Sequence, residues 1–279
     1  MKNFKNRVAV ITGASSGIGK ALAVELAAAG AKLALSDINE AGLKQVANEL
    51  GLKEDRLLIK AFDVADKDAV YAFADDVVAH FGEAHMIFNN AGVALGSTVE
   101  KMSYEDFEWL MGINFWGVVY GTKAFLPILK KADEGHIINI SSIFGIIGVP
   151  TQSAYNAAKF AVRGFTESLR LELEMDGGNV SCSSVHPGGI KTNIAKSARM
   201  SDDVAEITGG DAAQAKQDFE KLFRTTPEQA ARTILKGVKG NRRRILIGSD
   251  AVAVDAMQRL LPTSYQRIMV LGQKFTKKK

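Results

Sequence analysis

Two residues whose side chains could move a proton stand four positions apart, Tyr155 and Lys159. In a helix this spacing places both side chains on one face, one turn apart. A phenol ionises at about pH 10, and an adjacent ammonium lowers that pKa by favouring the phenolate, which would make Tyr155 a usable general acid or base. A lone pair of this kind is more often a surface tyrosine beside a lysine stem, so the interpretation depends on the elements that surround it.

Composition bounds those elements. The chain has 279 residues, of which 47% are hydrophobic and 24% charged, so it can bury a large core. The chain has a single cysteine, Cys182, so an intrachain disulfide is excluded and a reducing, cytoplasmic location is favoured. Because Cys182 lies in an apolar predicted strand, we expect it to be an unreactive buried residue. No signal peptide or membrane-spanning run is expected. The net charge of +4 comes largely from two basic clusters without interleaved aromatics, so we expect no nucleic-acid partner.

The beginning of the chain has the pattern of a nucleotide-binding unit. A β-branched run at 7–12 is followed by glycines at positions 13, 17 and 19 and then by an alanine- and leucine-rich helix that ends near Gly30. Glycines let the backbone approach a pyrophosphate, and the free N–H groups of the helix start attract its charge. The spacing G-x-x-x-G-x-G differs from the G-x-G-x-x-G fingerprint, so the flanking strand and helix carry much of the signal.

Asp37 ends a second predicted strand, about 20 residues past the glycines, where a dinucleotide fold places an acceptor for the adenosine ribose hydroxyls. The carboxylate would repel a 2′-phosphate, and Ser15, Ser16 and Ile38 supply no positive charge to offset it. We therefore expect NAD rather than NADP. The alternative is that Asp37 caps the next helix, with Glu40 completing a capping box.

Strands and helices alternate along the rest of the chain. Strands are expected at 56–62, 86–88, 136–140, 180–185 and 244–247, and helices at 66–81, 104–129, 152–175 and 227–238. Such alternation predicts an α/β fold with a doubly wound parallel sheet and helices on both faces. We expect one catalytic domain over 1–250, with a flexible helical substrate lid at about 190–225, followed by an extension over 251–279.

Six motifs then resemble, in order and spacing, the short-chain dehydrogenase/reductase family over about residues 7 to 248. They are Thr12-Gly13-x-x-x-Gly17-x-Gly19, Asn89-Asn90-Ala91-Gly92, Asn114, Ser142, Tyr155-x-x-x-Lys159 and Pro187-Gly188-x-x-x-Thr192. The resemblance implies a seven-stranded Rossmann sheet and an NAD-dependent oxidoreductase. It also implies a homodimer or homotetramer built on the helices that carry Asn114 and Tyr155.

The resemblance implies four catalytic residues. Tyr155 would exchange a proton with an alcohol or carbonyl, and Lys159 would lower its pKa and hold the nicotinamide ribose. Ser142, thirteen residues before Tyr155, would hydrogen-bond the reacting oxygen, and only this spacing selects it over Ser141. Asn114 would carry a water that connects Lys159 to solvent, although it could instead be a buried amide bonded to backbone.

The cofactor site implied by the resemblance lies along the motifs, with Asp63 and Val64 flanking the adenine and Asn90 near the adenosine ribose. It comprises Gly13, Ser15, Ser16, Gly17, Ile18, Gly19, Asp37, Asp63, Val64, Asn90, Ala91, Gly92, Tyr155, Lys159, Pro187, Gly188, Ile190 and Thr192. His186 precedes Pro187 and is expected to be a packing or hydrogen-bonded histidine rather than a catalyst. No cluster has the spacing of metal ligands, so we expect no metal.

The loops expected beside the nicotinamide are largely apolar, at 93–96, at 143–150 and after Thr192. They predict a hydrophobic secondary alcohol or ketone as substrate. The expected contacts are Ser142, Phe144, Val149, Tyr155 and Met200. Two alternatives remain, an NADP-linked reductase such as a 3-oxoacyl thioester reductase, and a dinucleotide-sensing protein without turnover.

The extension over 251–279 has apolar residues at helical spacing and several basic side chains. Such a helix can lie on a membrane surface. We favour packing of its apolar face on its own domain or on a neighbouring subunit.

Overall fold

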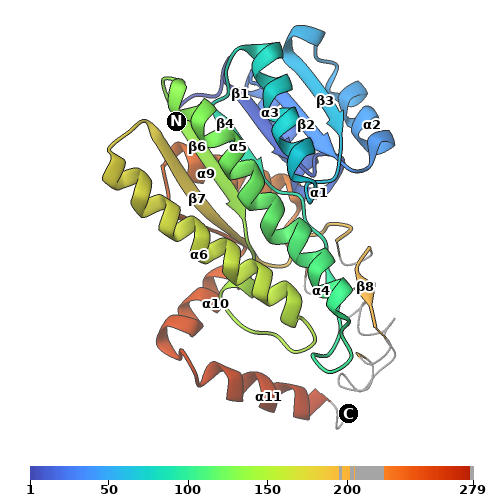
Figure 1. Ribbon diagram of the computed structural model, residues 1–279. Coiled ribbons are helices and arrows are strands. Elements are labelled where there is room, and N and C mark those ends of the chain that lie inside the picture. The colour runs from blue at the N-terminus through green and yellow to red at the C-terminus, as the bar shows by residue number, and fades with distance from the viewer. Residues whose placement is uncertain (195–196, 202–203, 205–222, 277–279) are drawn as a thin grey trace.

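Seven parallel strands form the central sheet of the protein. The computed structural model (Figure 1) describes residues 1–194, 197–201, 204 and 223–276, of which 272–276 are described only as helix. The strand order β3-β2-β1-β4-β6-β7-β9 reverses direction between β1 and β4, as in a doubly wound fold. The predicted sheet is therefore confirmed. Its strands are β1 (Val8–Thr12), β2 (Lys32–Asp37), β3 (Leu57–Ala61), β4 (Met86–Asn89), β6 (Gly135–Ile140), β7 (Val180–Pro187) and β9 (Arg244–Ile247).

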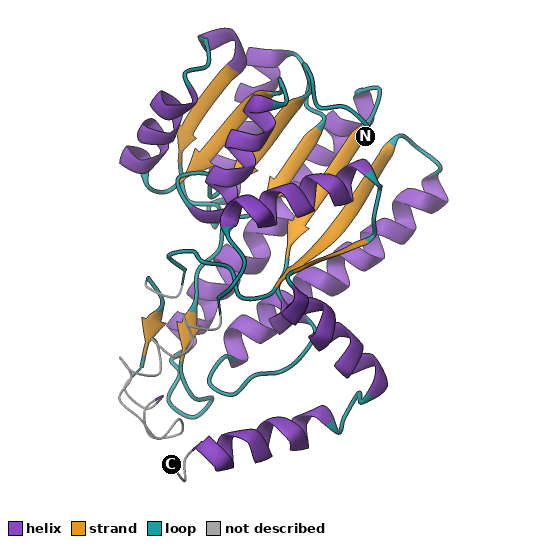
Figure 2. Cartoon of the chain, turned by 180° about the vertical axis from the view of Figure 1, so that it is seen from behind, coloured by secondary structure: helices purple, strands orange, loops and turns teal. Residues whose placement is uncertain are grey.

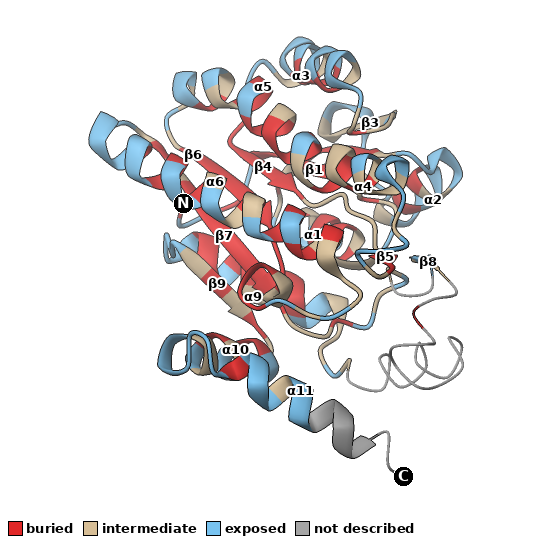
Figure 3. Ribbon diagram, turned by 60° about the horizontal axis from the view of Figure 1, so that its bottom comes forward, coloured by how far each residue is buried: buried red, intermediate tan, exposed pale blue. Residues whose placement is uncertain are grey.

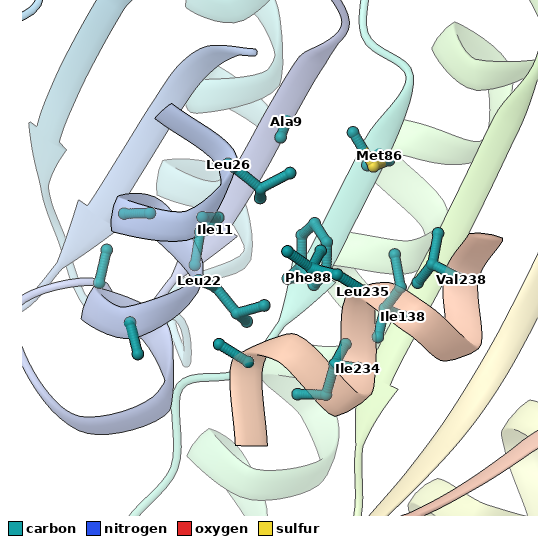
Figure 4. Packing of buried hydrophobic residues seen from close by; sticks show 14 of the residues in the cluster. Ala9, Ile11, Leu22, Leu26, Met86, Phe88, Ile138, Ile234, Leu235 and Val238 are labelled. Atoms are coloured by element: carbon teal, nitrogen blue, oxygen red, sulfur yellow. The ribbon is translucent and has the colours of Figure 1, made fainter. Parts of the chain in front are cut away.

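Helices cover both faces of this sheet, which is why its central strands are apolar along their whole length. All five residues of β1 are buried. One face packs against α1 (Gly17–Ala28), α2 (Glu40–Leu50) and α9 (Pro227–Lys239). Figure 4 shows this layer, in which Leu22 and Leu26 of α1, Phe88 of β4 and Leu235 of α9 belong to one buried cluster. The other face packs against α3 (Lys67–Phe81), α5 (Gly117–Lys131) and α6 (Ser153–Asp176).

The predicted helix around Asn114 contains a π-helical turn. α4 (Tyr104–Met111) runs directly into η2 (Gly112–Trp116) and then into α5. A π turn inserts one extra residue into a helix and is frequent at functional sites. The sequence predicts an interruption at Asn114, and the structure shows that the chain remains helical through it.

Two short strands form a second sheet beyond the main one. β5 (Leu95–Gly96) pairs in parallel with β8 (Arg199–Met200), and both are visible apart from the central sheet in Figure 2. The region predicted as a helical lid without strands therefore contains a strand, which is a correction to that prediction. Residues 195–196, 202–203 and 205–222 of the predicted lid lie outside the described residues.

Two further helices follow the last strand. α10 (Ser249–Leu260) contacts β9, and α11 (Tyr265–Thr276) follows a turn that contains Pro262. Tyr265 is buried at the start of α11, whereas Ile268 and Leu271 are about half exposed. Figure 3 shows that the described part of α11 is mostly exposed. The described residues also form two 3-10 helical turns, η1 (Glu54–Arg56) and η3 (Ile143–Gly145). Among the helices of the described residues, none is long and apolar enough to cross a membrane.

Candidate active site

The carboxyl ends of four neighbouring strands place most of the predicted site residues at one edge of the sheet. The glycine loop follows β1, Asn90 follows β4, Ser142 follows β6, and Pro187 ends β7. Ligands of doubly wound folds bind at this edge, outside the point where the strand order reverses. Topology alone therefore brings together motifs that lie more than a hundred residues apart.

The glycine loop has a conformation that side chains would obstruct. Gly13 and Gly17 adopt positive φ angles of 66° and 55°, a region that glycine enters without steric cost. A Cβ added at Gly13 would lie 2.8 Å from the Cα of Ala91, and one at Gly19 would clash with the Gly13 carbonyl. Among the described residues, the side chain of Ser16 caps no N–H group of α1. The loop thus leaves helical N–H groups open to an anion and fits a pyrophosphate.

Asn90 and Thr12 join the glycine loop to the end of β4. The Thr12 hydroxyl accepts the N–H groups of Asn90 and Ala91 at 3.0 and 3.1 Å. The Asn90 amide donates in return to the carbonyl oxygens of Thr12 and Gly13, at 2.9 and 3.1 Å. These bonds assign Asn90 the task of holding the loop, while its proximity to a ribose stays a prediction.

Asp37 binds the glycine loop rather than capping α2. Its Oδ2 accepts the N–H of Ser15 at 2.9 Å, and its Oδ1 accepts the N–H of Asn39 at 2.9 Å. The N-cap of α2 is Asn39, whose side chain accepts from the N–H of Gly42. The capping-box alternative is therefore wrong, and the Asp37 carboxylate lies where a ribose acceptor is expected.

Asp63 and Val64 follow β3 on the same side of the fold. Asp63 accepts the N–H of Ala65 at 2.9 Å, which fixes the turn before α3. Val64 is buried, and a Cβ added at Gly117 would lie 2.9 Å from one of its methyl groups. Both residues are held by the protein, and their predicted contact with adenine stays a prediction.

Tyr155 lies in the first turn of α6 beside Ser142 and Lys159. The Ser142 side chain lies close enough to the Tyr155 hydroxyl to interact with it, and this interaction by itself lowers the Tyr155 pKa. The Lys159 Nζ lies 5.5 Å from the centre of the Tyr155 ring and donates to the Ile140 carbonyl at 3.0 Å. The three predicted catalytic residues are therefore neighbours in space.

The pKa of Tyr155 departs from the sequence prediction. Although the residue keeps some surface exposure, desolvation raises its pKa to about 12 in the chain by itself, against the opposing hydrogen bond from Ser142. Desolvation also lowers the pKa of Lys159 to about 8. A lowered phenol pKa was predicted from the ammonium alone, and this is corrected because burial of both groups outweighs their mutual attraction.

Both polar atoms of the Asn114 side chain form a hydrogen bond with backbone. Its Oδ1 accepts the N–H of Val93 and its Nδ2 donates to the Val93 carbonyl, both at 2.8 Å. A Cβ added at Gly92 would lie 3.2 Å from the Asn114 Oδ1 and 3.6 Å from the Lys159 Nζ. Asn114 thus matches the backbone-bonded alternative while lying near Lys159, and its role in a water relay stays a prediction.

Two further polar side chains, those of Ser141 and His186, form hydrogen bonds next to Ser142. The Ser141 hydroxyl donates to the Lys159 carbonyl at 2.8 Å, so it is committed to α6 and Ser142 is the one beside Tyr155. His186 is fully buried, with Nδ1 2.9 Å from the Ser142 carbonyl oxygen and Nε2 2.9 Å from the Ser184 hydroxyl. Burial lowers the pKa of His186 to about 4, so it is neutral at pH 7 and Nδ1 carries the proton. The hydrogen-bonded interpretation of His186 is confirmed.

Cys182 is inert, as predicted. It is fully buried in β7, and its Sγ donates to the Thr166 carbonyl at 3.4 Å. Desolvation raises its pKa to about 12, so the reactive thiolate does not form near neutral pH.

The turn after β7 packs against the glycine loop. A Cβ added at Gly17 would lie 3.1 Å from the Thr192 methyl group, which places Thr192 against the loop. Ile190 is buried and forms a β-bridge with Thr225. Asp250 of α10, which the motifs do not contain, accepts the N–H of Gly189 at 2.7 Å. In sequence Asp250 resembles any acidic residue in a first helical turn, so its contact could not be foreseen.

Of the predicted apolar substrate contacts, Phe144 packs against Tyr155. Its ring meets the Tyr155 ring edge to face at 5.9 Å. Met200 lies over Gly96, where an added Cβ would be 2.5 Å from the Met200 sulfur. Val149 packs instead with Ile146, Ile147 and Tyr265, so its contact with substrate stays a prediction.

Arg199, beside Met200, ties the described part of the predicted lid to α4. Its guanidinium lies 3.6 Å from the centre of the Trp109 ring and pairs with Asp106 at 2.7 Å. The backbone N–H of Arg199 also donates to the Ala94 carbonyl at 3.1 Å. The sequence pattern did not single out this residue, because neither partner is near it in the chain.

Known proteins share this sequence and fold. A family model described as short chain dehydrogenase matches residues 7–203. The chain is 49% identical to the "Putative oxidoreductase SadH" of Mycobacterium tuberculosis, covering 98% of this chain and 97% of that protein. It is 33% identical to the "C alpha-dehydrogenase" of a Sphingobium species, over 86% and 80% of the two chains. A short-chain dehydrogenase/reductase from Burkholderia phymatum, solved in complex with NAD, superposes with a TM-score of 0.84 at 30% identity, over 93% and 95% of the two chains.

Proposed function

Because the chain belongs to the short-chain dehydrogenase/reductase family, we propose that it transfers a hydride between NAD(H) and a hydrophobic secondary alcohol or ketone. The observation that carries the proposal is the grouping of Ser142, Tyr155 and Lys159 beside the glycine loop. A general acid or base must lie within hydrogen-bond reach of the proton it moves, and the Ser142 side chain that would hold the reacting oxygen lies close enough to the Tyr155 hydroxyl to lower its pKa.

Bound nicotinamide supplies the hydride acceptor or donor. In alcohol oxidation, Tyr155 as phenolate takes the hydroxyl proton of the substrate, and in carbonyl reduction it returns that proton to the new alkoxide. The Ser142 hydroxyl donates a hydrogen bond to the reacting oxygen, which holds it against Tyr155. His186 fixes the backbone of Ser142 from behind, so the donor is positioned before substrate arrives.

Electrostatics must stabilise the phenolate for this to work at neutral pH. With a pKa of about 8, Lys159 carries its charge at pH 7 in most molecules. Its ammonium lies 5.5 Å from the Tyr155 ring, and the positive charge of oxidised nicotinamide acts in the same direction. Both charges oppose the desolvation that raises the Tyr155 pKa in the chain by itself.

Two observations support NAD as the cofactor. The Asp37 carboxylate is held at the glycine loop by the Ser15 N–H, where it would accept ribose hydroxyls and repel a 2′-phosphate. In the sequence, Ser15, Ser16 and Ile38 provide no compensating cation. The Burkholderia phymatum relative, 30% identical, was solved with NAD.

The surroundings of Tyr155 support an apolar substrate. Tyr155 packs in a cluster with Val93, Leu95 and Met111, and Phe144 faces its ring. Burying an apolar group of the substrate there is favourable at roughly 25 cal/mol per Å². We extend the proposal to a cytoplasmic homo-oligomer, since Trp116, Phe160 and Leu171 leave apolar surface exposed along η2 and α6.

A panel of secondary alcohols with NAD or NADP, followed by the absorbance of the reduced cofactor, tests the proposal. We expect turnover of aryl or long-chain carbinols with NAD and little with small polyols or hydroxy acids. A strong preference for hydroxy acids would contradict the substrate class, and a marked preference for NADP would contradict the role of Asp37. Binding of NAD without turnover of any alcohol would favour the dinucleotide-sensing alternative.

A further inference from the structure

Two loops of the proposed active site contact the helices that follow the last strand. The first, called the cofactor turn, comprises residues 187–192 after β7. The second, called the substrate loop, comprises residues 143–150 after β6. We call residues 249–276, which form α10 and α11, the C-terminal extension.

Asp250 of the extension holds the cofactor turn through backbone. Its Oδ2 accepts the Gly189 N–H at 2.7 Å, while the Gly188 N–H bonds to the Ile247 carbonyl at 2.9 Å. A Cβ added at either Gly188 or Gly248 would clash with the same carboxylate. Gly248 also has a φ of 95°, which favours glycine. Gly188 and Gly248 thus leave the space that the Asp250 carboxylate occupies, so the contact depends on the residue types at all three positions.

Tyr265 of the extension holds the substrate loop. Its ring is 5% exposed and packs with Ile146 and Ile147, which are buried in the same cluster. Its hydroxyl oxygen accepts the Gly148 N–H at 3.1 Å. Apart from Val149 of the loop itself, the rest of this cluster comes from β9 and from the extension, as Leu246, Val254, Met257 and Met269.

The other side of the substrate loop is fixed by the residue next to Tyr155. Asn156 accepts the Val149 N–H at 3.0 Å and donates to the carbonyls of Phe144 and Ile147 at 2.7 and 2.8 Å. The loop is therefore held between the catalytic helix and the extension. Its first residues include Phe144, whose N–H donates to the Ser142 hydroxyl oxygen at 3.1 Å. A shift of the substrate loop would therefore also move Ser142.

We propose that the C-terminal extension is part of the active site, with Asp250 positioning the cofactor turn and Tyr265 positioning the substrate loop. The inference rests on the proposed function, because the two loops matter only if they border nicotinamide and substrate. Neither residue touches the reacting atoms, so both are positioning residues. Since they act on different loops, their loss affects different binding steps.

The test compares Asp250→Ala and Asp250→Asn with Tyr265→Phe and Tyr265→Ala in the full chain. Binding of NADH is measured by fluorescence, KM and kcat by turnover of an alcohol from the panel, and backbone hydrogen exchange over both loops without substrate. Asp68→Ala and Tyr104→Phe are matched controls, because both side chains are strongly exposed on α3 and α4, away from the two loops.

We expect Asp250→Ala to weaken NADH binding about tenfold and to speed exchange of the cofactor turn, leaving the KM of the alcohol within about twofold. Asp250→Asn keeps an acceptor oxygen and should retain most of the NADH affinity. Tyr265→Phe should speed exchange at Gly148 about fivefold, as expected for the loss of one hydrogen bond. Tyr265→Ala should raise the KM of a bulky alcohol about tenfold while NADH binding stays within about twofold.

Exchange that is unchanged in both loops, or variants that weaken NADH and alcohol binding equally, would show that the extension is only a structural support. The exchange measurement needs no alcohol and so judges the proposed contacts even if no substrate is turned over. If the unmodified chain turns over no alcohol but the variants still show the expected changes in hydrogen exchange, the proposed function is contradicted and the proposed contacts of the extension are not.

Discussion

The Nδ1 of His186 lies 2.9 Å from the carbonyl oxygen of Ser142. A buried neutral imidazole therefore fixes the backbone of the serine whose hydroxyl meets Tyr155. We expect His186→Ala to lower kcat about tenfold and to leave NADH binding unchanged, because the donor loses its position but the cofactor turn does not. Steady-state kinetics with His80→Ala, an exposed histidine of α3, as control would decide; equal kcat in both variants would contradict the positioning role.

Three buried histidines, His85, His136 and His186, have lowered pKa values and so contribute to the response of stability to acid. Burial lowers the pKa of His186 to about 4 and that of His136 to about 3, from an ordinary value of 6.5. The unfolded chain then binds more protons than the folded chain between pH 6.5 and these values, so stability is full above pH 6.5 and falls as pH drops.

As the pH falls from 7 to 5, His136 and His186 should each lower the unfolding free energy by about 2 kcal/mol. Urea unfolding at the two pH values measures the loss, and in His186→Gln, which does not titrate, the loss should be smaller by about 2 kcal/mol. An unfolding free energy that stays constant from pH 7 to pH 5 would mean that these histidines are already solvated in the folded protein.

The order of strands and helices was predictable because apolar β-branched runs and helical periodicity alternate along the chain. The sheet, and the grouping of Ser142, Tyr155 and Lys159 at its edge, follow from that order. The pKa of Tyr155 was not predictable, because sequence spacing gives the neighbouring charge but not the water that burial removes. Spacing likewise shows Glu40 three residues after Asp37, but not which side chain caps the helix.

The cofactor preference can be tested at Asp37 without disturbing the glycine loop. Asp37→Asn keeps an oxygen that can accept the Ser15 N–H but removes the negative charge beside the expected 2′ position. We expect the ratio of kcat/KM for NAD over NADP to fall about tenfold, because charge repulsion of the 2′-phosphate is lost. An unchanged ratio would assign the discrimination to another residue.

The close packing of the glycine loop leads to a prediction for Gly19. Gly19→Ala places a methyl group against the Gly13 carbonyl, so the loop must shift away from the proposed pyrophosphate position. Binding of NADH should weaken about tenfold or more. Gly164→Ala is the matched control, since no described atom lies within 4 Å of a Cβ added there, and it should bind NADH normally. Equal affinities for the two variants would place the cofactor elsewhere.

The long-range contacts of the site were beyond the reach of the sequence. Arg199 with Trp109, Asp250 with Gly189 and Tyr265 with Gly148 each join residues from separate elements. No periodicity or local motif encodes such pairs, because each depends on how loops of the folded chain approach one another. The family motifs name the residues around the proposed reaction, whereas these contacts hold the loops that carry them.

The central claim is that Tyr155 exchanges the proton of the reaction, and Tyr155→Phe tests it most directly. This variant keeps the ring that packs against Phe144 and loses only the hydroxyl. We expect turnover of the alcohol to fall by a factor of about a thousand or more, with NADH binding within about twofold of the unmodified protein. Turnover that persists at a comparable rate in Tyr155→Phe would contradict the account.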